Sequence, residues 1–272
     1  MSHFAQAAVP VALTIAGSDS GGGAGIQADL RTFAFHQVHG TSALTCVTAQ
    51  NTVGVTRVDA LPPAAVIAQI EAVTSDIGVQ AAKTGMLLNQ GIIEAIAAHL
   101  KAQPIARLVV DPVMVSRTGA KLIDGGAMAA LCDQLLPLAA VLTPNRYEAQ
   151  MLAQMEITTL AEMQAAAEKI QALGCTAVVV KGGGFQGELR GVDVWFDGEQ
   201  MEILRTAQVD TQNTHGTGCT LSSAITANLA KGLDSLAAVT AAKAYVTQAL
   251  QHALSIGKGQ GPVGHFYPLL DS

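Results

Sequence analysis

The chain has 272 residues, of which 50% are hydrophobic and only 13% are charged, and its formal net charge is −6. This composition predicts a globular protein with a large apolar core, and the length suits one large α/β domain spanning residues 1–272. The negative charge argues against a nucleic-acid partner, because a phosphate backbone requires a basic face.

Membrane and secreted proteins are also disfavoured as classes. No run in the sequence approaches about 20 consecutive apolar residues, so no membrane span is expected. The first basic residue among the lysines and arginines is Arg31, so the apolar start at 9–15 lacks the basic region of a signal peptide. The cysteines have no metal-site spacing and predict free thiols in a reducing cytoplasm: Cys46, Cys132, Cys175 and Cys219.

The first half of the chain alternates apolar runs with helical segments. The run at 11–16 predicts a strand that ends in a glycine-rich loop at 17–25, and a helix follows over 24–37. The elements expected next are a strand at 41–48, a helix beginning at 62–63, a strand at 80–83 and a helix at 89–101.

The second half continues the alternation. It predicts strands at 108–110, 141–143 and 176–180, a helix beginning near 145, a helix at 160–173, a β-hairpin at 193–204, and helices at 217–231 and 235–256. The alternation predicts a mostly parallel sheet with helices on both faces and a ligand beyond the carboxyl ends of the strands. The polar residues expected at those ends are Asp19, Lys83, Asp111, Asn145 and Lys181.

The segment at 213–220, with sequence NTHGTGCT, is the most informative stretch. Gly216 and Gly218 allow a tight turn that aims backbone N–H groups at one point, and the helix that follows adds its dipole. This pattern predicts a phosphate site. Cys219 is expected to have a lowered pKa and to deprotonate or hold a substrate; the alternative is an inert core cysteine. His215 is given no chemical role, because capping or positioning explains it equally well.

Acidic and basic residues at other strand ends suit phosphoryl transfer. Asp111 follows an apolar strand and is a candidate for holding Mg²⁺ through water, although a turn cap is the alternative. Glu148 lies in the first turn of a helix, where the dipole alone favours an acid, but beside Asp111 it becomes a second Mg²⁺ candidate. Lys181 precedes glycines that let a cation and the backbone approach a phosphate. The Walker A pattern is absent from the sequence.

Gln50 and Asp29 suggest a second half of the site. An amide and a carboxylate together read the donor and acceptor edge of a heteroaromatic ring. The loop at 17–25 has no clean dinucleotide fingerprint, and its glycines have the alternative role of closing a strand–helix turn.

A series of motifs occurs in a fixed order along the chain, at 16–30, 49–52, 83–87, 111–114, 143–145, 180–183, 213–220 and 257–263. This ordered set resembles the hydroxymethylpyrimidine/phosphomethylpyrimidine kinases of thiamine biosynthesis, in the ribokinase-like superfamily. The resemblance covers about Val11 to Phe266 and implies a three-layer α/β/α kinase with a small β-hairpin. Such an enzyme uses MgATP to phosphorylate 4-amino-5-hydroxymethyl-2-methylpyrimidine and then its monophosphate, and members are commonly homodimers.

The resemblance also implies roles for individual residues. Cys219 is expected to act on the hydroxymethyl group, with Gly216, Thr217 and Gly218 forming the anion hole. The residues expected to bind the pyrimidine are Gly17, Asp29, Gln50, Met86, Val113 and Cys219. Those expected to bind ATP are Asn145, Lys181, Asn213, Gly216 and Gly218, and those expected to bind Mg²⁺ are Asp111 and Glu148.

The chain departs from the usual pattern at a few positions, and other functions remain open. Arg31 stands where lysine is frequent, Ser116-Arg117-Thr118 where smaller neutral residues are common, and Thr48 where valine is frequent. The hydroxyl of Thr48 leaves the preference between pyrimidine and pyridine rings open. One alternative is a pyridoxal or pyridoxine kinase of the same fold. Another is a non-catalytic vitamin-binding protein, which the retained glycines and Asp111 disfavour.

Overall fold

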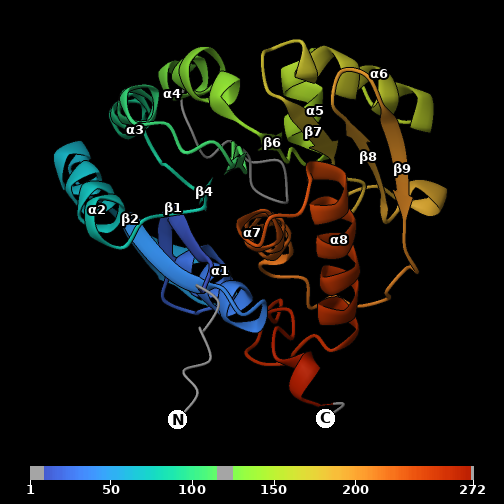
Figure 1. The fold of residues 1–272 in the computed structure, drawn as a ribbon. Coiled ribbons are helices and arrows are strands. Elements are labelled where there is room, and N and C mark those ends of the chain that lie inside the picture. The colour runs from blue at the N-terminus through green and yellow to red at the C-terminus, as the bar shows by residue number, and fades with distance from the viewer. Residues whose placement is uncertain (1–8, 115–124, 271–272) are drawn as a thin grey trace, which may run out of the picture.

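A nine-stranded sheet runs through the computed structural model, which describes residues 9–114 and 125–270 (Figure 1). The strand order is β3-β2-β1-β4-β5-β6-β7-β8-β9. Neighbours from β2 to β7 are parallel, whereas β3 at one edge and the β8–β9 hairpin at the other are antiparallel. The strands are β1 (Val11–Asp19), β2 (His39–Gln50), β3 (Val55–Ala60), β4 (Ala81–Thr84), β5 (Leu108–Val110), β6 (Val141–Leu142), β7 (Ala177–Val180), β8 (Val192–Phe196) and β9 (Met201–Arg205).

Helices cover both faces of the sheet (Figure 1). One face packs against α1 (Gly25–Phe35), α7 (Thr217–Ala230) and α8 (Ser235–Gln251). The other packs against α2 (Pro63–Asp76), α3 (Gln90–Ala102), α4 (Gly125–Ala130), α5 (Arg146–Ala153) and α6 (Leu160–Gln171). The predicted three-layer α/β/α fold is confirmed. Among the described residues, no helix is both long and apolar enough to cross a bilayer.

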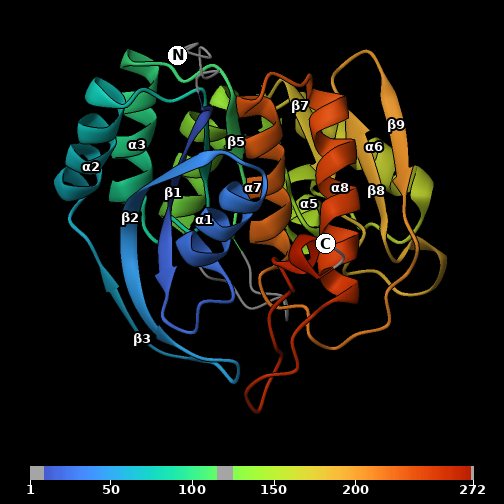
Figure 2. The same ribbon diagram turned by 60° about the horizontal axis from the view of Figure 1, so that its bottom comes forward.

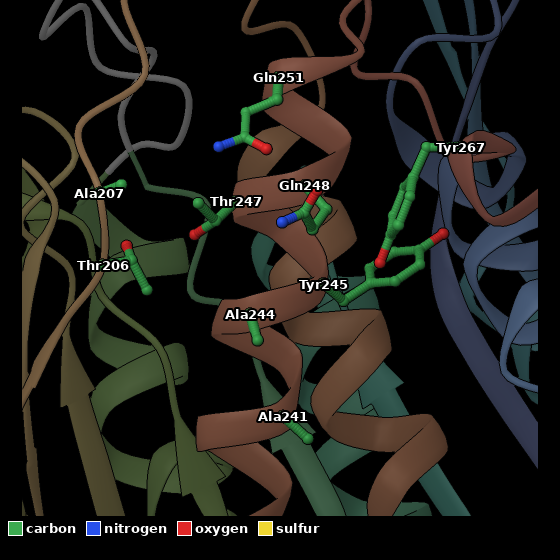
Figure 3. A pocket seen from close by; sticks show the side chains of 9 residues that line it. All are labelled: Thr206, Ala207, Ala241, Ala244, Tyr245, Thr247, Gln248, Gln251 and Tyr267. Atoms are coloured by element: carbon green, nitrogen blue, oxygen red, sulfur yellow. The ribbon is translucent and has the colours of Figure 1, made fainter. Parts of the chain in front are cut away.

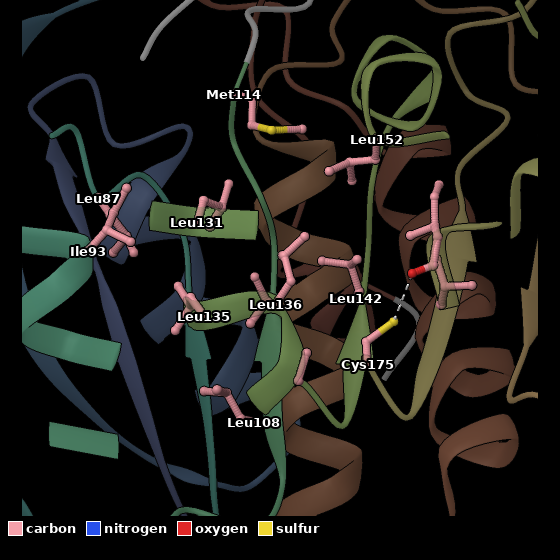
Figure 4. Close-up of a cluster of buried hydrophobic side chains, with 14 of the residues drawn as sticks. Leu87, Ile93, Leu108, Met114, Leu131, Leu135, Leu136, Leu142, Leu152 and Cys175 are labelled. Atoms are coloured by element: carbon pink, nitrogen blue, oxygen red, sulfur yellow. Dashed lines mark hydrogen bonds between the residues drawn. The ribbon is translucent and has the colours of Figure 1, made fainter. Parts of the chain in front are cut away.

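Two apolar cores follow from the alternation of side chains along the strands. In β5, Leu108 and Val110 join the cluster beneath α2–α6, whereas Val109 between them joins the cluster beneath α7 and α8. Figure 4 shows part of the first cluster, where Leu108 and Leu142 of the sheet lie near the leucines of a short helical segment at 131–138. The sheet is therefore buried on both faces, as a parallel sheet requires.

Most predicted elements are confirmed, with local differences. β3 and the helical segment at 125–138 were not predicted, because all residues of β3 are exposed and glycines begin the helical segment. α8 ends at Gln251 rather than at 256, because the returning chain provides backbone hydrogen bonds there, from Leu254 N to Pro262 O and from Gly264 N to Ala249 O. Ser116, Arg117 and Thr118 lie outside the described residues.

The carboxyl ends of the parallel strands lie at one edge of the molecule. Figure 2 shows this edge at the bottom, where the β2–β3 turn and the loop after α8 project side by side. Asp19 and Gln50 end β1 and β2, and Asp111, Thr143 and Lys181 directly follow β5, β6 and β7. β8 is antiparallel to β7 and β9 is antiparallel to β8, so β9 runs in the same direction as the parallel strands. The chain therefore leaves β9 at this same edge, where α7 begins.

Candidate functional site

Asp111 joins three strand ends to α7. Its Oδ1 lies 3.1 Å from the Nζ of Lys181, and Thr143 donates to the same oxygen over 3.4 Å. Its Oδ2 accepts a hydrogen bond of 3.3 Å from Ser222 of α7. Burial alone would lower the pKa of Lys181, but the charges of Asp111 and Glu148 raise the pKa above its ordinary value. Lys181 is therefore a cation that is partly buried and held by Asp111.

Glu148 and Asn145 form a capping box at the start of α5. The Asn145 side chain accepts from the N–H groups of Tyr147 and Glu148, and Glu148 Oε2 accepts from Asn145 N over 2.8 Å. Glu148 Oε1 accepts from Met114 N over 3.1 Å, which fixes the chain after β5. Burial raises the pKa of Glu148 to about 7; Lys181 opposes this shift and Asp111 adds to it. Glu148 therefore has both of the features considered from the sequence: it caps α5, and it lies near Asp111.

The carboxylates of Asp111 and Glu148 fit a magnesium ion. Glu148 is only 2% exposed, and the nearby charge of Asp111 helps to raise its pKa. A cation bound beside the two carboxylates would oppose that shift and favour the ionised form of Glu148, as Lys181 does. Within the described ranges, no group of three or more His, Cys, Asp or Glu side chains could hold a metal by itself. Mg²⁺ usually needs only one or two carboxylates, because phosphate oxygens and water complete its shell.

The Gly216–Gly218 turn lies against this cluster. Gly216 is the N-cap of α7 with φ of 80°, and a side chain there would clash with the carbonyl of Gly23. A Cβ atom on Gly218 would lie 3.6 Å from Lys181 Nζ and 3.8 Å from Asp111 Oδ2. The N–H groups of Gly218 and Cys219 belong to the first turn of α7, where a helix leaves N–H groups without helical partners. They lie beside Lys181, and this combination suits a phosphate. The structure therefore brings the predicted anion hole and the predicted cation together.

Asn213 lies at the start of the same loop and holds the C-terminal segment. Its Oδ1 accepts a hydrogen bond of 2.9 Å from Gly261 N. His215 pairs with Pro262 in an isolated parallel bridge, and Gly259 N donates to Thr52 Oγ1 beyond β2 over 3.2 Å. The motif at 257–263 thus connects the loop that precedes α7, at 213–216, to the β2–β3 turn.

Cys219 is half-buried in the first turn of α7, and its sulfur accepts a hydrogen bond from Gly25 N. Burial raises its pKa to about 11; Lys83 opposes the shift, while Asp29 and Asp111 add to it. The expectation of a lowered pKa is therefore wrong, because burial near two carboxylates outweighs the helix dipole. At neutral pH Cys219 is a thiol.

Gly17 and Met86, both predicted to bind the ring, lie close together. A Cβ atom on Gly17 would come within 2.9 Å of Met86 Cε, and a side chain on Gly25 would clash with Gly17 O. Since Gly25 also contacts Cys219, these residues surround one small region. Val113 has a φ of 30°, a left-handed conformation that a β-branched residue rarely adopts. Such strain is often found at binding sites.

Asp29 is the centre of a buried hydrogen-bond network. Its carboxylate accepts from Thr14 Oγ1 at 2.6 Å, Lys83 Nζ at 2.8 Å and Ser223 Oγ at 2.5 Å. Burial would lower the pKa of Lys83, but the charge of Asp29 raises the pKa above its ordinary value. The sequence analysis placed Lys83 at the ligand edge of the sheet without a chemical role, and it did not identify Ser223. The position of Ser223, one helical turn after Cys219, was the available signal.

Asp19, His215 and Gln50 form a third group, at the ends of β1 and β2. His215 Nε2 lies 2.9 Å from Asp19 Oδ2 and 3.4 Å from Gln50 Nε2. Burial would raise the pKa of Asp19, but hydrogen bonds from His215 and from the N–H groups of Ala24 and Gly21 hold the pKa below its ordinary value. Asp19 is therefore ionised and organises the glycine-rich loop.

A separate hollow of about 540 Å³ lies along α8 (Figure 3). Its lining shares no residue with the predicted site: Thr206, Ala207, Ala241, Ala244, Tyr245, Thr247, Gln248, Gln251 and Tyr267.

Comparisons with known proteins give one consistent result. Residues 19–264 match the family model for phosphomethylpyrimidine kinase. A hydroxymethylpyrimidine/phosphomethylpyrimidine kinase from Synechococcus elongatus is 65% identical over 96% of this chain and 99% of its own. The ADP complex of Bacillus subtilis pyridoxal kinase is 42% identical, covers 97% of this chain and 100% of its own, and has a TM-score of 0.90. Phosphomethylpyrimidine kinase from Clostridium difficile is 41% identical, covers 89% and 99%, and has a TM-score of 0.80.

Proposed function

Because the chain belongs to the phosphomethylpyrimidine kinase family, we propose that this kinase phosphorylates 4-amino-5-hydroxymethyl-2-methylpyrimidine and then its monophosphate, for thiamine biosynthesis. ATP is the proposed phosphoryl donor. The observation that carries the proposal is the convergence of Lys181, Asp111 and the first turn of α7, with Cys219 on the side toward Gly17 and Met86.

The proposed chemistry is positioning and charge stabilisation. Phosphoryl transfer passes through a loose transition state whose charge spreads over the equatorial oxygens. The Gly218 and Cys219 amides and the Lys181 ammonium beside them would stabilise that charge. Asn145 and Asn213 would bind the nucleotide beside them. Asp111 and Glu148 would hold Mg²⁺, which would neutralise charge on the phosphate oxygens.

Cys219 is proposed to orient the hydroxymethyl group rather than to deprotonate it. With a pKa of about 11, its sulfur carries a proton at neutral pH and is a poor base. In a loose transition state the bond between the attacking hydroxyl oxygen and phosphorus has hardly formed. The hydroxyl group therefore still holds its proton at that point, and the reaction needs little help from a base. The thiol beside the anion hole is suited to hold the hydroxyl oxygen in line with the phosphoryl group.

A homodimer is proposed from the exposed edge of the sheet. All residues of β3 are exposed, including Val55 and Val58, and Val47 is exposed on the adjacent β2. An edge strand with exposed valines offers unpaired backbone groups and apolar side chains to another chain. Light scattering should report a dimer that Val58→Lys weakens.

A reducing cytoplasm is the proposed location of the protein. It is supported by the free cysteines, Cys46, Cys132, Cys175 and Cys219.

A pyridoxal kinase is the second candidate. It is favoured by the likeness to the B. subtilis pyridoxal kinase. Both candidates phosphorylate a hydroxymethyl group on a nitrogen heterocycle.

One assay separates the candidates. ATP consumption is measured side by side with hydroxymethylpyrimidine, its monophosphate and pyridoxal. Turnover of both pyrimidines is expected. Turnover of pyridoxal alone would replace the proposal with the second candidate, and turnover of none would favour a binding protein.

A further inference from the structure

His215 is seated on the glycine-rich loop. A Cβ atom on Gly23 would clash with the Cδ2 atom of the His215 ring, so only glycine at 23 allows the ring to approach. The approach brings His215 Nε2 to 2.9 Å from Asp19 Oδ2, and the same oxygen accepts from Gly23 N at 3.0 Å and Ala24 N at 2.8 Å. The ring is therefore fixed by two loops that are far apart in the sequence.

The contact with Asp19 determines where the His215 proton resides. An ionised carboxylate only accepts hydrogen bonds, so Nε2 of His215 must carry hydrogen. The single hydrogen on Nε2 goes to Asp19, so Nε2 has no lone pair left to accept a hydrogen bond from Gln50, whose nearest side-chain atom lies 3.4 Å away. The positive N–H edge therefore favours an amide oxygen over an amide NH2 group at that position.

Thr48 requires a hydrogen-bond donor from the other end of the Gln50 amide. Its hydroxyl donates its proton to Ser18 O over 2.8 Å, so it can only accept from the Gln50 amide atom that lies 3.3 Å away. In the structure, Gln50 Oε1 lies toward Thr48 Oγ1 and Gln50 Nε2 lies toward His215 Nε2. The first contact places two acceptors together and the second places two N–H groups together, so neither is a favourable hydrogen bond. A half-turn of the amide matches both, placing nitrogen toward Thr48 and oxygen toward His215.

The backbone of Gln50 is held independently. Ser20 Oγ donates to Gln50 O and accepts from Gln50 N, each over 2.7 Å. The end of β2 is thus clamped to the glycine-rich loop, and the orientation of the amide is the remaining freedom of this side chain.

We infer that His215 is a specificity-determining residue: together with Thr48 it orients the Gln50 amide so that one acceptor and one donor, side by side, face the substrate ring. This inference rests on the proposed function. That pair is complementary to a ring amino group next to an unprotonated ring nitrogen, the same match by which glutamine reads adenine. A 4-aminopyrimidine has this edge, whereas a 4-oxopyrimidine in its 3H form presents the opposite order.

The test compares 4-amino-5-hydroxymethyl-2-methylpyrimidine with its 4-oxo analogue, using kcat/KM with ATP and dissociation constants from calorimetry. The wild-type chain is expected to favour the amino compound by roughly 10- to 100-fold, the range of one bidentate contact. His215→Phe keeps a ring on Gly23 but loses the N–H donor, so the preference should fall below about 3-fold, mainly through KM. His215→Gln keeps an N–H donor and should retain most of the preference.

The matched control is His252→Phe. His252 contacts Gln248 O and stacks on Tyr267 at the end of α8, so its loss should leave the preference unchanged. If His215→Phe does not fold, Thr48→Val and Thr48→Ser replace it, because only serine keeps the acceptor. The preference should fall in the valine variant alone.

Distinct outcomes overturn the inference and the proposed function. The inference is overturned if His215→Phe keeps the wild-type preference, even when both analogues lose activity equally. It is also overturned if the two Thr48 variants show equal preferences. In either case, turnover of the amino compound by the wild-type chain still supports the proposed kinase function. A wild-type chain that neither binds nor phosphorylates the amino compound overturns both.

Discussion

Lys83 Nζ lies 2.8 Å from Asp29 Oδ1, and both side chains are completely buried. This ion pair links β4 to α1, and Ser223 joins it to α7 one turn beyond Cys219. The core of the site is therefore held by charge as well as by apolar packing.

Lys83→Met should destabilise the protein strongly. It leaves the Asp29 carboxylate buried without its cation, and breaking one side of a buried pair costs about 3–5 kcal/mol. Urea denaturation measures this loss in the free energy of unfolding. The control is Arg57→Met, which breaks an exposed pair with Asp59 and should change little. Equal effects of the two substitutions would contradict the account.

Asp111→Asn should abolish most activity while ATP still binds. It removes the partner of Lys181 and a proposed Mg²⁺ ligand, so kcat should fall by about 100-fold or more, as when a key transition-state charge is lost. Steady-state kinetics across Mg²⁺ concentrations provides the measurement. A variant with wild-type kcat at saturating Mg²⁺ would show that Asp111 is not part of the site.

Glu148 should make stability fall as pH rises in the absence of Mg²⁺. Its pKa is about 7 in the folded chain against 4.5 as the ordinary value, so between these values the folded state holds a proton that the unfolded state has lost. The free energy of unfolding should therefore decrease by up to about 1.4 kcal/mol per pH unit from pH 4.5 to 7. Glu148→Gln should remove this slope, as urea denaturation at pH 5 and 7 would show; an unchanged slope would assign it to other groups.

Cys219→Ser should slow transfer without changing the shape of the pH profile. Because the thiol pKa is about 11, a catalytic thiolate would make kcat/KM rise about tenfold per unit from pH 7 to 9. A positioning thiol predicts similar profiles for both chains, with the serine chain lower throughout. A steep rise in the wild-type chain that is absent from Cys219→Ser would restore the role of general base.

The sequence predicts the placement of Asp111, Asn145 and Lys181 because parallel strands end at the same edge of a sheet, so residues after successive strands must meet. It does not predict the contact between Asp19 and His215, which joins loops at opposite ends of the chain. It also gives the wrong direction for the pKa of Cys219. That shift depends on burial and on the charges of Lys83 and Asp29, which only the folded chain brings near.

The most direct measurement is a phosphorus NMR time course with MgATP and 4-amino-5-hydroxymethyl-2-methylpyrimidine. A single site at the strand ends that performs both transfers predicts a phosphomonoester signal first, followed by a diphosphate signal. Both should appear about 100-fold more slowly, or not at all, in Asp111→Asn. Loss of ATP with only inorganic phosphate as product, or no loss of ATP at all, would contradict the account.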